Sequence, residues 1–260
     1  MNIVVLVKQV PDTYSERTLA DSDHTLDRAS TEAVIDEINE RSVEAALQLK
    51  EADGGEVTVV CMGPERATDA IRKALSMGAD KAVHLSDEAL HGSDAVQTAK
   101  ALAKAIGTVE GYDLVITGNE ASDGRTGAVP AMIADVLGLP VLTHAQELAY
   151  SEGTVSVTRA TDDGVTKLTA ELPALVSVGE KLNDPRYPSF KGIMAAKKKP
   201  VETVTLADAG IDPSSVGLAN AYTTVTDSAP KPPKSAGEKV EDEGDGGSKI
   251  AQYLISQKIV

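Results

Sequence analysis

Strand-like and helix-like stretches alternate along the first 140 residues of the chain. The strand-like stretches are short and apolar, and they lie at residues 3–7, 57–60, 82–85 and 114–116. The stretches between them carry apolar residues at helical spacing, at residues 42–50, 64–78 and 94–106. Strands and helices that alternate in this way build a parallel sheet with helices on both faces. The sequence therefore predicts a doubly wound, mostly parallel α/β fold.

The pattern changes after Pro140. The segment from about residue 146 to residue 182 carries alternating β-branched side chains, interrupted by turn signals at Glu152-Gly153 and Asp163-Gly164. We expect this segment to be either a strand-rich addition to the same sheet or a small second sheet.

The chain beyond Lys199 is rich in proline, glycine and acidic residues, a composition that forms no core of its own. It nevertheless ends in apolar residues at helical spacing: Ile250, Tyr253, Leu254 and Ile259. The sequence therefore predicts a domain over residues 1–200 and a C-terminal arm over residues 201–260 that docks on another surface.

Composition excludes several classes of protein. The net charge of −15 argues against a nucleic acid as the main partner. No stretch approaches the roughly 18 consecutive apolar residues of a membrane span, and the N-terminus is typical of a first strand rather than of a signal peptide. Cys61 is the only cysteine, which rules out an intrachain disulfide and fits a reducing cytoplasm.

No motif in the chain indicates catalysis. The four histidines have no metal-ligand spacing, and zinc-protease, nucleophile-elbow and P-loop patterns do not occur. His91-Gly92-Ser93 is better explained as a polar loop in which Asp94 caps the next helix, with Gln97 at its third position. We therefore expect no metal site and no enzymatic centre.

A glycine-bearing loop, GNEASDGRTG, follows the strand at 114–116 and precedes a helical pattern at 128–137. In open parallel sheets, ligands bind beyond the carboxyl ends of strands, where glycines allow close approach and helix N-termini attract anions. Ser122 and Thr126 offer hydroxyl groups, and Arg125 is a candidate phosphate ligand. A turn rich in helix caps explains the same residues, so spacing alone leaves both interpretations open.

The single phenylalanine, Phe190, lies between Pro188 and Gly192 in a segment with a further proline at position 185. A segment punctuated in this way is expected to be a surface loop. A large apolar side chain at its tip, beside Lys191, is typical of a docking hot spot. An incidental exposed phenylalanine and one folded back into a small local core are the alternatives.

Five stretches together resemble the beta subunits of electron-transfer flavoproteins, and they cover nearly the whole chain: VLVKQVPDT, GPERATDAIRKALSMGADKAVHL, DLVITGNEASDGRTGAVPAMIADVLGLP, LPALVSVGEKLNDPRYPSFKGIMAAKKK and the tail SAGEKVEDEGDGG. The resemblance implies a Rossmann-like, adenine-nucleotide-binding fold in a heterodimer with an alpha subunit. That alpha subunit holds most of the FAD, while the beta subunit binds AMP structurally.

The resemblance also implies an electron carrier rather than an enzyme. Such a carrier passes electrons from acyl-CoA or similar dehydrogenases of fatty acid oxidation to a membrane quinone oxidoreductase. Two alternatives stay open: a bifurcating, NADH-oxidising subunit with a second FAD in place of AMP, and a nucleotide-binding stress-type module.

Site residues follow from the resemblance position by position. The AMP contacts fall on Leu6, Asp36, Glu37, Ile38, Asn39, Met62, Gly118, Asn119, Glu120, Ala121, Ser122, Asp123, Gly124, Arg125, Thr126 and Gly127. Thr13 and Tyr14 fall near the FAD. The docking contacts fall in a recognition loop of about residues 183–199, on Pro188, Phe190, Lys191 and Ile193, and residues 201–260 are implied to pack on the alpha subunit. The chain departs from the family in its shorter glycine loop and in IDEIN at residues 35–39, where relatives carry an Asn-Pro-aromatic stretch.

Overall fold

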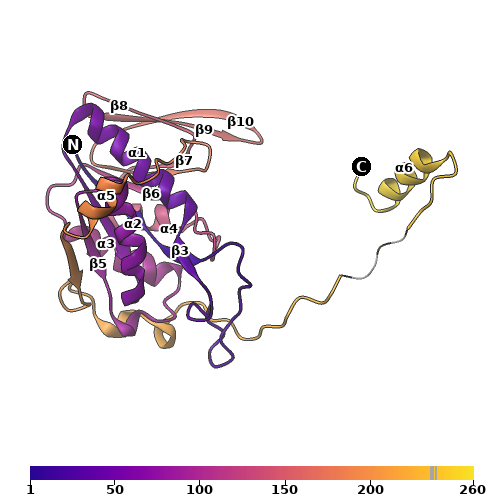
Figure 1. Ribbon diagram of the computed structural model, residues 1–260, viewed down its shortest axis with the longest axis horizontal. Coiled ribbons are helices and arrows are strands. Elements are labelled where there is room, and N and C mark those ends of the chain that lie inside the picture. The colour runs from indigo at the N-terminus through magenta and orange to yellow at the C-terminus, as the bar shows by residue number, and fades with distance from the viewer. Residues whose placement is uncertain (235–236, 238) are drawn as a thin grey trace. The chain divides into compact units, whose positions relative to one another are not determined.

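The computed structural model describes residues 1–234, 237 and 239–260. These form two compact units, Met1–Thr226 and Asp227–Val260 (Figure 1). Within the described ranges, no helix combines the length and the apolar character needed to cross a bilayer.

A seven-stranded parallel sheet forms the centre of the first unit, in the order β12-β5-β4-β1-β6-β11-β7. Its strands are β1 (Asn2–Val7), β4 (Glu56–Met62), β5 (Lys81–Leu85), β6 (Leu114–Gly118), β7 (Val141–Ala145), β11 (Ala174–Val178) and β12 (Val201–Val204). The predicted parallel sheet is confirmed.

Helices cover both faces of this sheet, namely α1 (Glu37–Asp53), α2 (Thr68–Met77), α3 (Ala95–Gly107) and α4 (Val129–Leu137). Ile3 and Val5 of β1 pack into a core with α1 and α2, whereas Val4 and Leu6 pack into a second core with α3 and α4. A strand buried on both faces has a continuous apolar sequence, which is the pattern of residues 3–7.

Helix ends follow local capping chemistry. Asp94 and Gln97 form the expected capping box at the start of α3. Helix α1 begins at Glu37 rather than near residue 42, because Asp36 caps it with a side-chain acceptor ahead of a polar first turn. Short 3₁₀ turns complete the connections, at η1 (Glu65–Ala67), η2 (Glu88–Leu90), η3 (Pro213–Ser215) and η4 (Leu218–Asn220).

The strand-rich segment combines both expected arrangements. Strand β11 joins the main sheet, as β7 just before the segment does, while β8 (Glu147–Ser151), β9 (Thr154–Thr161) and β10 (Gly164–Glu171) form an antiparallel sheet of their own. A further short pair, β2 (Gln9–Pro11) and β3 (Ala33–Ile35), brackets residues 12–32 and returns the chain to α1.

Residues 201–226 lie in the first unit, although the sequence analysis starts the arm at residue 201. Strand β12 pairs with β5 at the edge of the sheet, and Leu206 and Val216 are buried in the core on the α3 and α4 face. A four-residue edge strand carries too little periodic signal to be recognised from the sequence.

The second unit contains α6 (Gly246–Ser256), which carries Ile250 and Tyr253 as predicted, whereas Ile259 lies beyond the helix end. Three residues of the tail SAGEKV, at positions 235, 236 and 238, lie outside the described residues. Docking of this arm on an alpha subunit stays a prediction.

Candidate functional site

The candidate nucleotide site lies where the strand order reverses, between β1 and β6. From β1 the chain builds β4 and β5 on one side of the sheet, and it then returns to place β6 on the other side. Such a reversal opens a crevice beyond the carboxyl ends of the two strands, which is where open α/β sheets bind ligands. At this place hydrogen bonds join the start of α1, the loop after β6 and side chains from residues 8–28.

Gly118 allows α1 to approach the end of β6. A Cβ at this position would lie 2.7 Å from the side-chain nitrogen of Asn39 and 3.0 Å from Cγ2 of Ile38. A side chain here would displace the side chains of Asn39 and Ile38 in the first turn of α1. Glycine leaves room for them, and the close junction brings the two predicted site segments, 36–39 and 118–127, together.

Asp36 joins α1 to the glycine loop. Its Oδ1 accepts a hydrogen bond from the Ile38 backbone N–H at 3.0 Å, and its Oδ2 accepts one from the Ser122 backbone N–H at 2.7 Å. Asn39 adds a bond to the end of β1, because its Oδ1 accepts from the Lys8 backbone N–H at 2.7 Å. The buried Asp36 carboxylate thus fixes the loop on the helix.

Asp123 forms a buried ion-pair centre at the same crevice. Its carboxylate, 1% exposed, lies 2.7 Å from the Lys8 ammonium and 2.7 Å from the Arg28 guanidinium. Burial raises the pKa of Asp123, but the charges of Lys8 and Arg28 and their hydrogen bonds outweigh burial and hold that pKa below its ordinary value. The Arg17 guanidinium also donates to the Ser122 carbonyl oxygen at 2.7 Å.

Sequence reasoning missed these cations. Arg125, the predicted phosphate ligand, is 68% exposed and pairs with Glu120 at 3.4 Å. The cations that lie against the loop are Lys8, Arg17 and Arg28, of which two come from the segment 12–32. Of these three cations, Lys8 alone carried a signal in the sequence, since it directly follows the first strand.

Two polar atoms in the glycine loop are buried without a hydrogen-bond partner among the described residues: Oδ1 of Asn119 and Oγ of Ser122. The following helix α4 has no side-chain cap at Ala128, so its first N–H groups are open to an acceptor. Buried polar groups are almost always paired in native proteins, so these two oxygens have hydrogen-bonding capacity that a ligand or a water molecule would satisfy. The residues present fit a nucleotide, with an anion at the helix N-terminus.

The remaining predicted contacts lie at the carboxyl ends of β1 and β4 and in residues 12–32. Leu6 and Met62 pack into the core on the α3 and α4 face. Tyr14 is exposed, and its backbone N–H donates to the Asp12 side chain at 2.8 Å. Its aromatic ring is therefore available to a partner, and the expected place of Thr13 and Tyr14 near a flavin stays a prediction.

The recognition segment is a helix rather than a loop around Phe190. Phe190 is the first residue of α5 (Phe190–Ala196), and Ser189 caps this helix by accepting from the Gly192 N–H at 3.1 Å. The Phe190 side chain is 79% exposed, so the alternative of a small local core is wrong. Tyr187, Ile193 and Met194 are exposed beside it.

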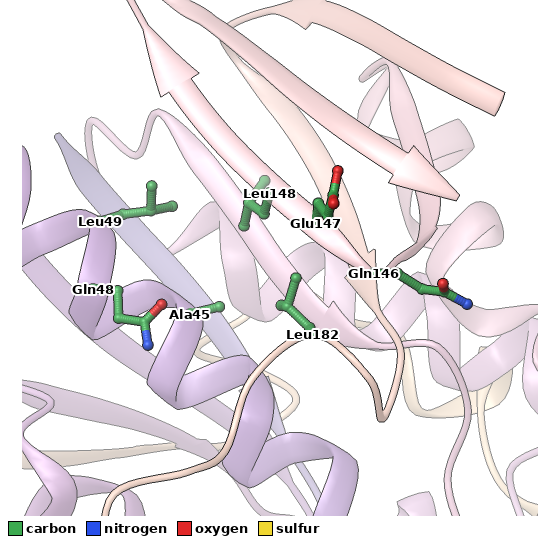
Figure 2. A pocket seen from close by; sticks show the side chains of 7 residues that line it. All are labelled: Ala45, Gln48, Leu49, Gln146, Glu147, Leu148 and Leu182. Carbon is green, nitrogen blue, oxygen red and sulfur yellow. The ribbon is translucent and has the colours of Figure 1, made fainter. Parts of the chain in front are cut away.

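Two hollows lie away from the glycine loop. One of about 330 Å³ lies between α1 and β8, and Figure 2 shows the side chains that line it: Ala45, Gln48, Leu49, Gln146, Glu147, Leu148 and Leu182. The other, of about 400 Å³, lies beside α5 and is lined by Arg72, Lys73, Ser76, Ile193, Ala196 and Lys197. The nucleotide interpretation therefore depends on the unpaired polar atoms of the loop and not on either hollow.

Comparison with known proteins identifies the family. A family model described as the electron transfer flavoprotein domain matches residues 23–209. The chain is 63% identical to the electron transfer flavoprotein subunit beta of Mycobacterium tuberculosis (strain ATCC 25618 / H37Rv), over 100% of this chain and 99% of the relative. This chain belongs to the electron transfer flavoprotein family, as a beta subunit.

More distant members of the family also match over nearly their full length. The subunit beta of Megasphaera elsdenii is 35% identical over 100% of both chains. The caffeyl-CoA reductase-Etf complex subunit CarD of Acetobacterium woodii is 36% identical over 99% of this chain and 97% of the relative. A beta subunit of this family has a role in electron transfer and implies an alpha-subunit partner.

Proposed function

We propose that this beta subunit binds AMP in the crevice between β1 and β6 and forms a heterodimer with an alpha subunit that holds most of the FAD. The heterodimer passes electrons from acyl-CoA or similar dehydrogenases to a membrane quinone oxidoreductase, in the cytoplasm. The unpaired, buried oxygens of Asn119 and Ser122 carry the nucleotide part of this proposal, because a bound ligand satisfies them.

The crevice supplies the groups that a nucleoside monophosphate needs. The uncapped start of α4 offers backbone N–H groups and the positive end of the helix dipole to the phosphate. The polar side chains of Asn119 and Ser122 are placed to bind hydroxyl or ring atoms. Asp123 already pairs with Lys8 and Arg28, so these two cations brace the loop and leave the phosphate to the helix N-terminus.

The segment around α5 supplies a docking surface for the dehydrogenase. Phe190 is the central exposed apolar side chain, with Pro188 before it and Ile193 one turn later. Exposed Lys191 gives this surface positive charge in a chain whose net charge is −15. A partner with an apolar pocket and an acidic rim is complementary to it.

Nucleotide released by acid from the co-expressed heterodimer tests the proposal. We expect one AMP and one FAD per heterodimer. Two FAD and no AMP would favour the bifurcating alternative, and a chain that carries nucleotide without pairing with an alpha subunit would favour the stress-type module.

The same assay locates the site through a matched pair of glycine variants. Gly127 has φ +66°, a conformation that a β-branched residue rarely adopts, whereas Gly107 at the end of α3 has no such restriction and open space around its Cβ position. Gly127→Val should therefore release AMP and weaken assembly, and Gly107→Val should retain both. Full AMP content in Gly127→Val would rule out this placement.

The C-terminal arm is proposed to pack on the alpha subunit, since α6 exposes Ile250, Tyr253 and Ile255 in a highly polar sequence. Deletion of residues 247–260 should weaken the heterodimer without lowering the melting temperature of the isolated beta subunit. Equal affinity for the alpha subunit, measured by titration of the truncated and full chains, would assign the arm another role.

A further inference from the structure

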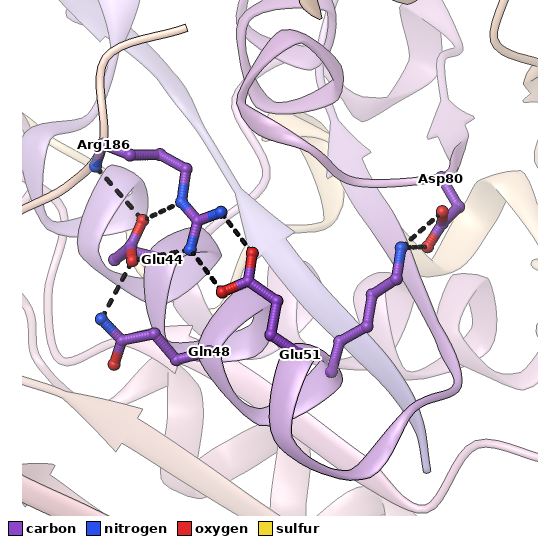
Figure 3. A network of polar contacts seen from close by, with 6 residues as sticks. Glu44, Gln48, Glu51, Asp80 and Arg186 are labelled. Atoms are coloured by element: carbon purple, nitrogen blue, oxygen red, sulfur yellow. Dashed lines mark hydrogen bonds and ion pairs between the residues drawn. The ribbon is translucent and has the colours of Figure 1, made fainter.

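Arg186 forms a dense set of charged hydrogen bonds just before the recognition segment. Its guanidinium donates to both Glu44 oxygens, at 2.7 and 3.0 Å, and to both Glu51 oxygens, at 2.5 and 3.1 Å. The Arg186 backbone N–H adds a bond to Glu44 at 3.2 Å, and Gln48 donates to the other Glu44 oxygen at 2.9 Å (Figure 3). One side chain thus ties the segment to two turns of α1.

Glu44 is buried, with 6% of its side chain exposed, so its carboxylate needs hydrogen-bond partners to offset the cost of burial. Burial raises the pKa of Glu44, but the hydrogen bonds from Arg186 outweigh it and leave that pKa below its ordinary value. The carboxylate is therefore charged at neutral pH and depends on Arg186 for compensation. Bidentate pairing of this kind fixes both direction and distance, which a single lysine contact does not.

Residues 196–199, which follow the segment, are hydrogen-bonded to α2. Arg72 donates to the carbonyl oxygens of Ala196 at 2.6 Å and Lys199 at 2.9 Å. The Lys199 ammonium in turn donates to the carbonyl oxygens of Leu75 and Ala79, at the end of α2. Lys199 is thus a structural cap at the C-terminal end of α2.

Helix α5 also packs closely on α2 in the middle of the segment. A Cβ at Gly192 would collide with the Ser76 carbonyl oxygen, so only glycine permits this approach. The exposed side chains of Tyr187, Phe190 and Met194 lie between the Arg186 contacts at one end of the segment and the Arg72 and Lys199 contacts at the other. The apolar surface is therefore exposed on a backbone that is fixed at both ends and in the middle.

We propose that Arg186 is a positioning residue for dehydrogenase docking, which holds the segment 187–194 on α1 so that Phe190 is presented in its docking conformation before the partner arrives. This inference rests on the proposed docking role of Phe190. Arg186 acts through the backbone, and its own guanidinium is occupied by Glu44 and Glu51. A segment ordered in advance avoids the entropic cost of ordering it at each encounter.

Two variants in the co-expressed heterodimer test the role of the hydrogen bonds between Arg186 and Glu44 and Glu51. Arg186→Lys keeps the charge but loses the forked geometry, and the double variant Glu44→Gln with Arg186→Gln leaves no uncompensated buried charge if Arg186→Lys fails to assemble. Each should raise the KM of an acyl-CoA dehydrogenase for the heterodimer about fivefold to tenfold. Turnover at saturation, the flavin spectrum and AMP content should not change, and amide hydrogen exchange over residues 183–196 should accelerate.

A matched control lies on the same helix. Lys50 donates to both Asp80 oxygens, at 2.6 and 2.7 Å, close to the end of α1, and within the described part of the chain it donates no hydrogen bond to residues 183–196. Lys50→Gln should lower thermal stability while leaving the dehydrogenase KM and the exchange of residues 183–196 unchanged. An equal rise in KM in this variant would mean that general stability, not positioning, controls docking, and would overturn the inference.

Combination with Phe190→Ala separates this inference from the function on which it rests. If Arg186 acts through the anchor, Arg186→Lys should raise KM less than twofold in the Phe190→Ala background. A normal KM for both Arg186 variants, or a full KM effect without Phe190, would overturn the positioning role while docking stands. If Phe190→Ala itself leaves KM unchanged, the docking proposal fails and this inference fails with it.

Discussion

The crevice between β1 and β6 and the recognition segment use charge in opposite ways. In the crevice, Asp123 pairs with Lys8 and Arg28 inside the protein, and the buried side-chain oxygens of Asn119 and Ser122 have no hydrogen-bond partner in the described part of the chain. In the recognition segment Arg186 is bonded to Glu44 and Glu51, and the exposed side chains include Phe190 and Met194 beside Lys191. The proposed nucleotide site thus leaves polar atoms for a ligand to satisfy, whereas the proposed docking site exposes apolar side chains on a backbone that hydrogen bonds hold in place.

Helix α1 supports both regions through different turns. Its first turn, at Asp36 and Asn39, holds the glycine loop and the end of β1. Its middle and last turns, at Glu44 and Glu51, hold Arg186. Because the contacts do not overlap, changes in one region should leave the other intact.

The largest expected effect is on the crevice. Asp123→Asn removes a buried charge that pairs with two cations, and we expect it to lower the free energy of unfolding by about 3 kcal/mol. AMP content should fall, while the dehydrogenase KM should stay at the parent value. Glu120→Gln is the control on the same loop, because its carboxylate pairs with the exposed Arg125 and should contribute less than about 0.5 kcal/mol. Equal losses in the two variants would contradict the special role of the buried pair.

Acid titration sharpens this test. The pKa of Asp123 is lower in the folded protein than the ordinary value of about 4, so its ionised form stabilises the fold above that pH. The gap in unfolding free energy between the parent and Asp123→Asn should therefore be constant between about pH 5 and 7. It should shrink as the pH falls below about 4 and through the folded pKa. A gap that persists in acid would indicate lost packing rather than lost charge.

A smaller effect, confined to the other region, is expected from Phe190→Ala. Truncation of a docking anchor costs about 2 kcal/mol, or roughly a thirtyfold loss in kcat/KM with the dehydrogenase. Unfolding stability, AMP content and flavin reduction by a small-molecule donor should be unchanged because the side chain is already exposed. Val165→Ala, at an exposed apolar position on β10, should have no effect on docking. Equal turnover of Phe190→Ala and the parent would refute the anchor, and joint loss of AMP would refute the independence of the two regions.

Much of the fold could be predicted because its signals are local. The buried strands at 3–7 and 57–60 are visible as apolar runs, and Asp94 with Gln97 indicates the start of α3 within four residues. The glycine loop could be placed between a strand and a helix for the same reason. Strand β12 and helix α5 could not be predicted, since each is too short to show a period.

The sequence by itself determined the alternation of strands and helices, the position of the glycine loop and the family of the chain. Only the tertiary structure decided which charges meet: Arg28 reaches Asp123 across 95 residues, and Arg186 reaches Glu44 across 142. Periodicity and capping act within a few residues and are written in the local sequence. Pairing across the chain depends on strand order and on which face each helix covers, so it is fixed only when the sheet closes around its two cores.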